Sequence, residues 1–200
     1  LFWHMIFCAG HSKIDSGMEM GRMIALFREH GMGNFDNLLL KLSTNPGMMY
    51  YLDNTESHKT NLNENYGREL LELFSMGVGM DGHANYTEDD VKECSRAFTG
   101  WTIANNIPGQ PYGRYAAKFV YNPGDHDDGE KTFLGETGRF NGEDIIEIIC
   151  QQPATARFLS RHLYNYFVAD EAQVPAWMDT PPRDPDTIKM LEDEYFRSGY

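Results

Sequence analysis

The run from Asn63 to Phe74, NENYGRELLELF, constrains the fold of this chain more than any other segment. Its leucines and its phenylalanine recur at the spacing of one helix face. Asparagine is a favoured N-cap and stands at the start of the run, while Gly77 is placed to end a helix. The run therefore predicts an amphipathic helix that reaches about Ser75.

Helix-start signals of the same kind recur along the chain. In each case a capping residue or a proline precedes apolar residues at helical spacing. These signals stand at Ser16-Gly17, Asn34, Asn45-Pro46, Thr87-Glu88-Asp89-Asp90, Asn141-Gly142, Pro153 and Asp186. Because Leu1–Cys8 also has the apolar character of a buried helix, the sequence predicts a mainly α, irregular multi-helix domain of about eight helices.

One segment departs from the helical pattern. Apolar and polar residues alternate from Tyr115 to Tyr121, and Lys131–Leu134 follows after the turn-rich stretch Pro123–Glu130. Alternation on both sides of a Gly- and Asp-containing turn is typical of paired strands. We therefore expect one small β-hairpin near residues 115–135.

The chain has 200 residues, 41% of them hydrophobic, which is enough for one domain with a core. No internal boundary is visible in residues 1–200, and the apolar start and uncapped end predict a domain truncated at both ends. No apolar run approaches the ~18 residues of a membrane span. The net charge of −13, with basic residues scattered among acids, argues against nucleic-acid binding.

The predicted central helix carries two polar rows. Glu64, Arg68 and Glu72 are four residues apart and share a stripe, beside a second row formed by Asn65 and Glu69. One interpretation is a solvated stripe of salt bridges, which is common on helices. The other is a polar wall facing a cleft, where carboxylates and an arginine could hold a metal or a substrate.

The segment from Asp125 to Thr132 also has two interpretations. His126 and the carboxylates of Asp127 and Asp128 could donate nitrogen and oxygen ligands to a divalent cation. Asp-Gly is equally what a tight turn requires, because glycine adopts positive φ at little cost. Neither an EF-hand loop nor a P-loop is present, and the chain has no HExxH or Gly-x-Ser-x-Gly motif.

Several blocks of the sequence occur in an order that resembles a known family. They are Phe2-Trp3-His4, Gly33-Asn34-Phe35, Tyr51-Leu52-Asp53-Asn54, the Asn63–Phe74 run, Tyr86–Val91, Ala97-Phe98-Thr99-Gly100-Trp101, His126–Gly135 and Pro153–Phe158. Together they resemble the bacterial family called Domain of Unknown Function 1800, over nearly the whole chain. One departure is local: many members continue the Trp-His step with Asn and a second His, where this chain has Met5-Ile6.

The resemblance implies a location and a partner but no reaction. Many members look exported, so it implies an extracytoplasmic protein of the periplasm or cell envelope. Their genes often neighbour another exported family, which implies an exported protein partner. The family has no established activity, and the resemblance predicts no oligomeric state.

The polar residues inside the family-like blocks are the candidates for a site, because such residues usually serve a site or a buried network. We assign catalytic roles to Glu64, Arg68, Glu69 and His126, and ligand binding to Asn63, Asn65, Lys131 and Trp101. If a divalent metal is the cofactor, its candidate ligands are Glu69, Glu72, His126 and Asp127. Trp101 has a structural alternative, since a buried tryptophan could pack the hairpin on the helices.

Two functions remain open at this stage. The first is metal- or carboxylate-assisted hydrolysis in a polar cleft between the central helix and the Asp125–Thr132 turn. The second is a non-catalytic module that binds or matures an envelope partner, with the same polar residues paired in a structural network. A site requires these groups to converge around a cavity, whereas a network requires them to pair with one another.

Overall fold

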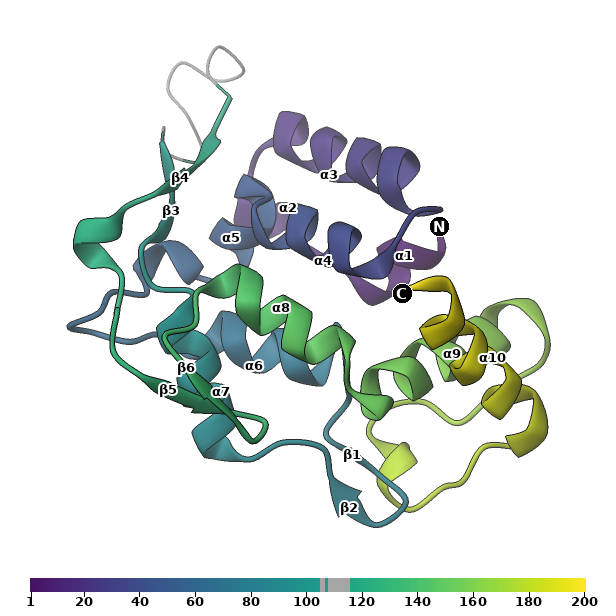
Figure 1. Ribbon diagram of the computed structural model, residues 1–200. Helices are drawn as coiled ribbons and strands as arrows, with labels where there is room; N and C mark the ends of the chain where they lie inside the picture. The colour runs from purple at the N-terminus through teal and green to yellow at the C-terminus, as the bar shows by residue number, and fades with distance from the viewer. Residues whose placement is uncertain (105–106, 108–115) are drawn as a thin grey trace.

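The structure is a computed structural model that describes residues 1–104, 107 and 116–200 (Figure 1). Its α-helices in the described part of the chain are α1 (Phe2–Ile6), α2 (His11–Ile14), α3 (Gly17–His30), α4 (Phe35–Ser43), α5 (Pro46–Tyr51), α6 (Asn65–Glu72), α7 (Glu88–Ala97), α8 (Gly142–Cys150), α9 (Pro153–Phe167) and α10 (Pro185–Ser198). Short 3-10 helices lie at Asn54–Glu56, Pro123–Asp125 and Ala176–Met178. The predicted mainly α class is confirmed.

Three small antiparallel pairs complete the described fold. Strand β1 (Gly79–Met80) pairs with β2 (His83–Ala84), β3 (Trp101–Ala104) with β4 (Lys118–Tyr121), and β5 (Lys131–Phe133) with β6 (Glu136–Gly138). The predicted pairing across residues 123–130 is therefore wrong, although both of its strands exist. Tyr115, where we expected the hairpin to begin, lies outside the described residues.

The reason for the wrong pairing is that β4 has a partner already in place. Trp101 is buried at the end of α7, and β4 aligns with it in the register Trp101↔Tyr121. Strand β5 instead turns back on itself through Leu134 and Gly135, both at positive φ, to pair with β6. Leu134 donates its N–H to Asp90 at 2.8 Å, which ties this turn to the start of α7.

The helices pack around α6 and α8, which lie near the centre of the view in Figure 1. Helix α6 packs on α7, α4 packs on α8, and α9 pairs with α10 at one end of the molecule. Helix α7 also packs against β5, which places the 123–130 turn beside it. In the described part of the chain, no helix combines the length and the apolar character needed to cross a membrane.

Local signals explain most of the helix starts. Thr87 and Asp90 form a reciprocal capping box at α7, and Asn141 and Asp144 form another at α8. Asn45 caps α5 through its side chain. Asn34 precedes α4 as predicted, but its side chain donates to Gly199 O at 2.8 Å instead of capping the helix.

Gly67 explains how α6 and α7 come so close together. A Cβ at this position would overlap Ser95 Oγ and would lie 3.1 Å from Ser95 N and 3.2 Å from Val91 O. Two of these atoms belong to the backbone of α7, so they cannot move without moving that helix. The glycine costs helix stability, of the order of 1 kcal/mol relative to alanine, in exchange for a close helix–helix contact.

We expect Gly67→Ala to destabilise the protein by about 1–3 kcal/mol, because the added methyl overpacks a tight contact. Urea unfolding followed by circular dichroism measures the change. Gly21→Ala is the matched control, since it also lies inside a helix and its Cβ would meet nothing within 4 Å. The control is expected to stabilise by up to about 1 kcal/mol, and equal effects of both changes would contradict the explanation.

Candidate functional site

The polar face of α6 is half-buried and points towards the start of α7. Arg68 makes a two-pronged ion pair with Glu88, with nitrogen–oxygen distances of 2.9 and 2.6 Å, and its Nη2 lies 3.6 Å from Glu64. Glu69 and Glu72 lie on the same helix and are also half-buried. Arg68 is thus held by carboxylates of the chain itself.

Glu69 is a half-buried carboxyl group on this face. Burial and the nearby Glu72 raise its pKa, and Arg68 only partly opposes them. Burial and Glu72 also raise the pKa of the neighbouring Tyr86 phenol. A carboxyl group with a raised pKa keeps its proton to higher pH, which is the property that a general acid needs.

The His126 segment is built differently, because it is folded against the end of α7. His126 is 5% exposed, and its Nδ1 donates to Thr99 O at 2.8 Å. Asp127 donates its backbone N–H to Thr99 Oγ1 at 2.8 Å, and the hydroxyl in turn donates to Arg96 O at 2.6 Å. One ring nitrogen of His126 therefore anchors the turn to the end of α7.

Arg96 holds the same turn through its side chain. Its Nε and Nη2 donate to the two carboxylate oxygens of Asp127 at 2.7 and 3.1 Å, and Nη1 donates to Glu93 at 2.6 Å and to Glu130 O at 3.2 Å. Such a fork is a strong, orienting interaction. The hydrogen bonds from Arg96 lower the pKa of Asp127 to about 2.

Lys131 completes this arrangement from β5. Its side chain is buried, and Nζ donates to Asp127 O at 2.5 Å and to Gly129 O at 3.0 Å. Burial lowers the pKa of its ammonium group. We call Arg96, Thr99, His126, Asp127 and Lys131 the turn network, since each is bonded to another member or to the turn backbone.

The depressed pKa of Asp127 predicts a pH dependence of stability. The ordinary pKa of 3.8 falls to about 2 in the fold, because Arg96, the N–H of Gly129 and Lys131 all favour the charged carboxylate, so together they stabilise the protein by about 2 kcal/mol above pH 4. This contribution is lost as the pH falls from about 4 through 2, and it is gone below pH 2, where the carboxylate is protonated in both the folded and the unfolded state. The difference in unfolding free energy between the wild type and Asp127→Asn, measured in urea at pH 6 and pH 2, is therefore expected to shrink. An equal difference in unfolding free energy at the two pH values would contradict this explanation.

The remaining predicted ligand-binding residues also have partners inside the chain. Asn63 Oδ1 accepts the N–H of Asn65 at 2.9 Å, and Asn65 Nδ2 donates to Leu52 O at 3.2 Å. Trp101 is 1% exposed; its Nε1 donates to Asn141 Oδ1 at 2.8 Å. Its carbonyl accepts a hydrogen bond from Asn54. The contacts of Asn65 and Trp101 join parts of the chain that are distant in sequence, whereas Asn63 bonds a near neighbour.

Helix α7 separates the two groups of predicted site residues. Glu88 at its start accepts hydrogen bonds from Arg68, and Arg96 near its end donates hydrogen bonds to Asp127. Eight residues of helix span about 12 Å, so the α6 face and the turn network do not share one set of contacts. In the described ranges, no three or more His, Cys, Asp or Glu side chains gather so as to hold a metal ion. The predicted metal set of Glu69, Glu72, His126 and Asp127 is thus not brought together.

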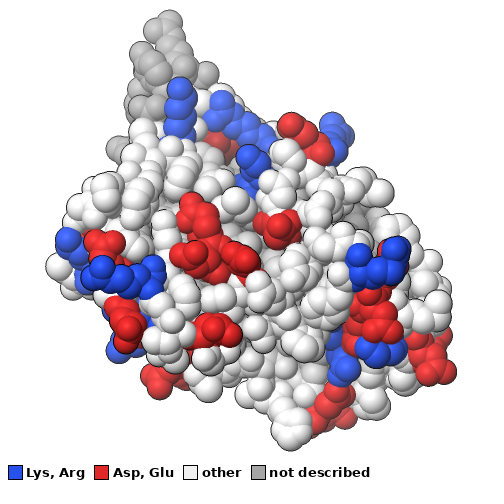
Figure 2. All heavy atoms as spheres, viewed as in Figure 1, with Lys and Arg blue, Asp and Glu red and all other residues white. Residues whose placement is uncertain are grey.

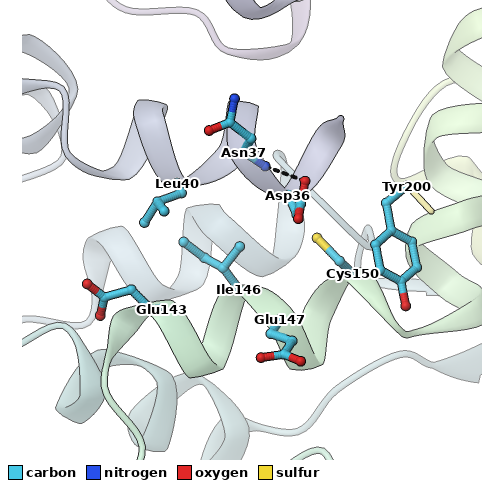
Figure 3. Close-up of a pocket in the computed structure, with 8 residues that line it drawn as sticks. All are labelled: Asp36, Asn37, Leu40, Glu143, Ile146, Glu147, Cys150 and Tyr200. Carbon is cyan, nitrogen blue, oxygen red and sulfur yellow. Dashed lines mark hydrogen bonds between the residues drawn. The ribbon is translucent and has the colours of Figure 1, made fainter. Parts of the chain in front are cut away.

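A hollow that the sequence did not predict lies between α4 and α8 (Figure 3). We call it the α4–α8 groove; it has a volume of about 350 Å³ and is lined by Asp36, Asn37, Leu40, Glu143, Ile146, Glu147, Cys150 and Tyr200. The two helices run in opposite directions, with Leu40 towards Glu143 and Asp36 towards Cys150. Burial raises the pKa of the Cys150 thiol to about 12, so this cysteine stays protonated.

Comparison with known families identifies the class of protein. The sequence model described as "Protein of unknown function (DUF1800)" matches residues 1–200, so this chain belongs to that family. No curated protein and no solved structure matches the chain. The resemblance inferred from the ordered sequence blocks is confirmed.

Proposed function

We propose that this chain is a non-catalytic binding module, in which the polar residues of the family-like blocks maintain the fold and the surface contacts a partner. The pairing within the turn network carries the proposal. His126, Asp127 and Lys131 are each engaged by the chain's own groups: His126 and Lys131 donate to backbone carbonyls, and the Asp127 carboxylate accepts mainly from the Arg96 side chain. This is the behaviour of a structural network, since a site must leave some of its groups free for a ligand.

The pockets support the same proposal. The described pockets are lined by residues of α4 and α8, of α9 and α10, of α1 and α3, and of β6 and α8. None of these linings includes a residue that we predicted to be catalytic. We further propose, from the family resemblance, that the protein acts outside the cytoplasm; fractionation of producing cells tests this location.

Stability and turnover together test the module. Lys131→Met is expected to destabilise the protein by about 1–3 kcal/mol, because it leaves Asp127 O and Gly129 O without their donor. Turnover is measured on phosphomonoester, carboxyl-ester and glycoside substrates, with and without added divalent cations. If the wild type turns over any of these substrates, we expect Glu69→Gln and His126→Gln to retain that turnover. A hydrolysis lost in either variant, with the fold unchanged, would overturn the proposal.

One observation favours a second candidate function, carboxylate-assisted hydrolysis on the α6 face. Glu69 has a raised pKa and lies beside Glu72, which is how enzymes prepare one carboxyl as acid and another as base. The two functions differ in what Glu69→Gln does. If the protein is a hydrolase, this substitution abolishes turnover. If it is a binding module, we expect the substitution to cause only a small change in stability.

A further inference from the structure

The α4–α8 groove has an apolar floor and an acidic rim. Leu40, Ile146 and Cys150 lie between the two helices, and Tyr200 lies at one end (Figure 3). Asp36 borders the groove from α4, and Glu143 and Glu147 border it from α8. Because Glu143 and Glu147 are four residues apart, they stand about 6 Å from each other on one face of α8.

The rim carboxylates lack cationic partners within the part of the chain that the structure describes. Asp36 accepts only the N–H of the neighbouring Asn37, at 2.6 Å, and no Lys or Arg pairs with Glu143 or Glu147. Several surface acids of helices α7 and α10 do have such partners, as Glu88, Glu93 and Glu194 show. The groove thus leaves negative charge uncompensated beside the partly exposed side chains of Leu40 and Tyr200.

A second hollow extends this acidic surface across α8. It is lined by Glu136, Thr137, Phe140, Asp144, Glu147, Ile148 and Gln151, so it shares Glu147 with the groove. Figure 2 shows acidic side chains gathered in the middle of this face, over the position of α8 in Figure 1. Neither described lining contains a Lys or Arg. The two adjoining hollows therefore present five carboxylates to one occupant, with Leu40 and Tyr200 partly exposed in the first and Phe140 and Ile148 in the second.

We propose that the α4–α8 groove docks a basic amphipathic segment of a partner protein. Lys or Arg side chains one helix turn apart would meet Glu143 and Glu147, and an aliphatic side chain between them would cover the partly exposed Leu40. Such complementarity favours fast and specific association. A second copy of this chain does not fit, since each copy carries a net charge of −13 and would bring further negative charge to the rim. This inference rests on the proposed binding function and names its surface and its partner's chemistry.

A labelled peptide tests the docking surface. The probe is a helical peptide of about twelve residues with Arg at four-residue spacing and Leu between them, and its matched control carries Glu in place of each Arg. Fluorescence anisotropy measures binding to the whole chain at about 0.05 and 0.5 M salt. The wild type is expected to bind the Arg peptide and not the Glu peptide, and added salt is expected to weaken binding.

Two double variants locate the binding. Glu143→Gln/Glu147→Gln is expected to weaken Arg-peptide binding by about tenfold or more, as losing two rim charge contacts implies. Glu56→Gln/Asp170→Asn removes the same charge from exposed positions outside the groove and is expected to change binding by less than about twofold. No binding, equal loss in both variants, or complete competition by spermidine alone would each overturn the proposal.

The outcomes separate the two proposals. If the protein is folded and shows no turnover but does not bind the peptide, the docking surface is overturned and the proposed binding module is not. A hydrolysis that depends on Glu69 or His126 overturns the module, whatever the peptide does.

Discussion

Arg161→Met is expected to destabilise the protein by about 3–5 kcal/mol, the usual cost of removing one partner of a buried ion pair. The side chains of Arg161 and Glu171 are both fully buried, with Nη2 2.8 Å from Oε1. The guanidinium also lies over the Trp177 ring, 4.7 Å from its centroid, and donates to Thr180 O. These contacts hold the connection between α9 and α10, so its loss should loosen both helices.

The carboxylate left behind explains most of this expected loss. Although burial by itself would raise the pKa of Glu171, hydrogen bonds from Arg161 and from the N–H groups of Arg183 and Ala172 lower it. Without Arg161, burial is opposed only by the two backbone donors. Urea unfolding should therefore show a partial recovery in Arg161→Met/Glu171→Leu, which removes both charges. A single variant within about 1 kcal/mol of the wild type would contradict the argument.

Trp101→Ala is expected to cost a similar amount, about 3–5 kcal/mol. The indole is almost completely buried and meets Phe98 and Phe119 edge-to-face, with ring centroids 4.9 and 5.1 Å away. Deleting it opens a cavity where α7, β3 and β4 meet, and leaves Asn141 Oδ1 with the N–H of Gly142 as its remaining donor. Thermal unfolding measures the change.

Trp101→Phe separates packing from hydrogen bonding. It keeps most of the ring contacts and removes the indole N–H, one of two donors to Asn141 Oδ1, so we expect a loss of about 1 kcal/mol. If Trp101 served only to bind a ligand, as one of our sequence interpretations had it, Trp101→Ala would leave the midpoint of thermal unfolding unchanged.

The sequence predicted helices well where their signals are local. The start of α7 depends on Thr87 and Asp90, which are three residues apart and cap each other in the structure. Strand pairing depends on partners distant in sequence, and here the prediction failed. Thr102 opposes Val120 only because Trp101 is anchored among the helices. The short α2 was missed, because four residues carry too little periodicity to be recognised.

The candidate site shows the same limit. His126 and Lys131 stood out as polar residues in a motif. The turn that they hold also depends on Arg96, which lies 31 residues before its partner Asp127 in the sequence. No spacing rule links the two positions, so the sequence could not reveal the turn network. The α4–α8 groove was missed for a related reason. Asp36 and Glu147 have unremarkable neighbours along the chain, and only the packing of α4 on α8 brings them together.

The contact between Asn34 and Gly199 bears on the order in which the molecule assembles. Asn34 Nδ2 donates to Gly199 O, and Phe35 N donates to Tyr200 O, across a sequence separation of 165 residues. Closing a loop of that length in an unfolded chain costs about 4–5 kcal/mol of entropy, so these bonds should form only after the intervening helices have condensed. Because Tyr200 closes one end of the α4–α8 groove, the groove is completed late in folding, and its ability to bind a peptide reports that the whole chain has reached its native topology.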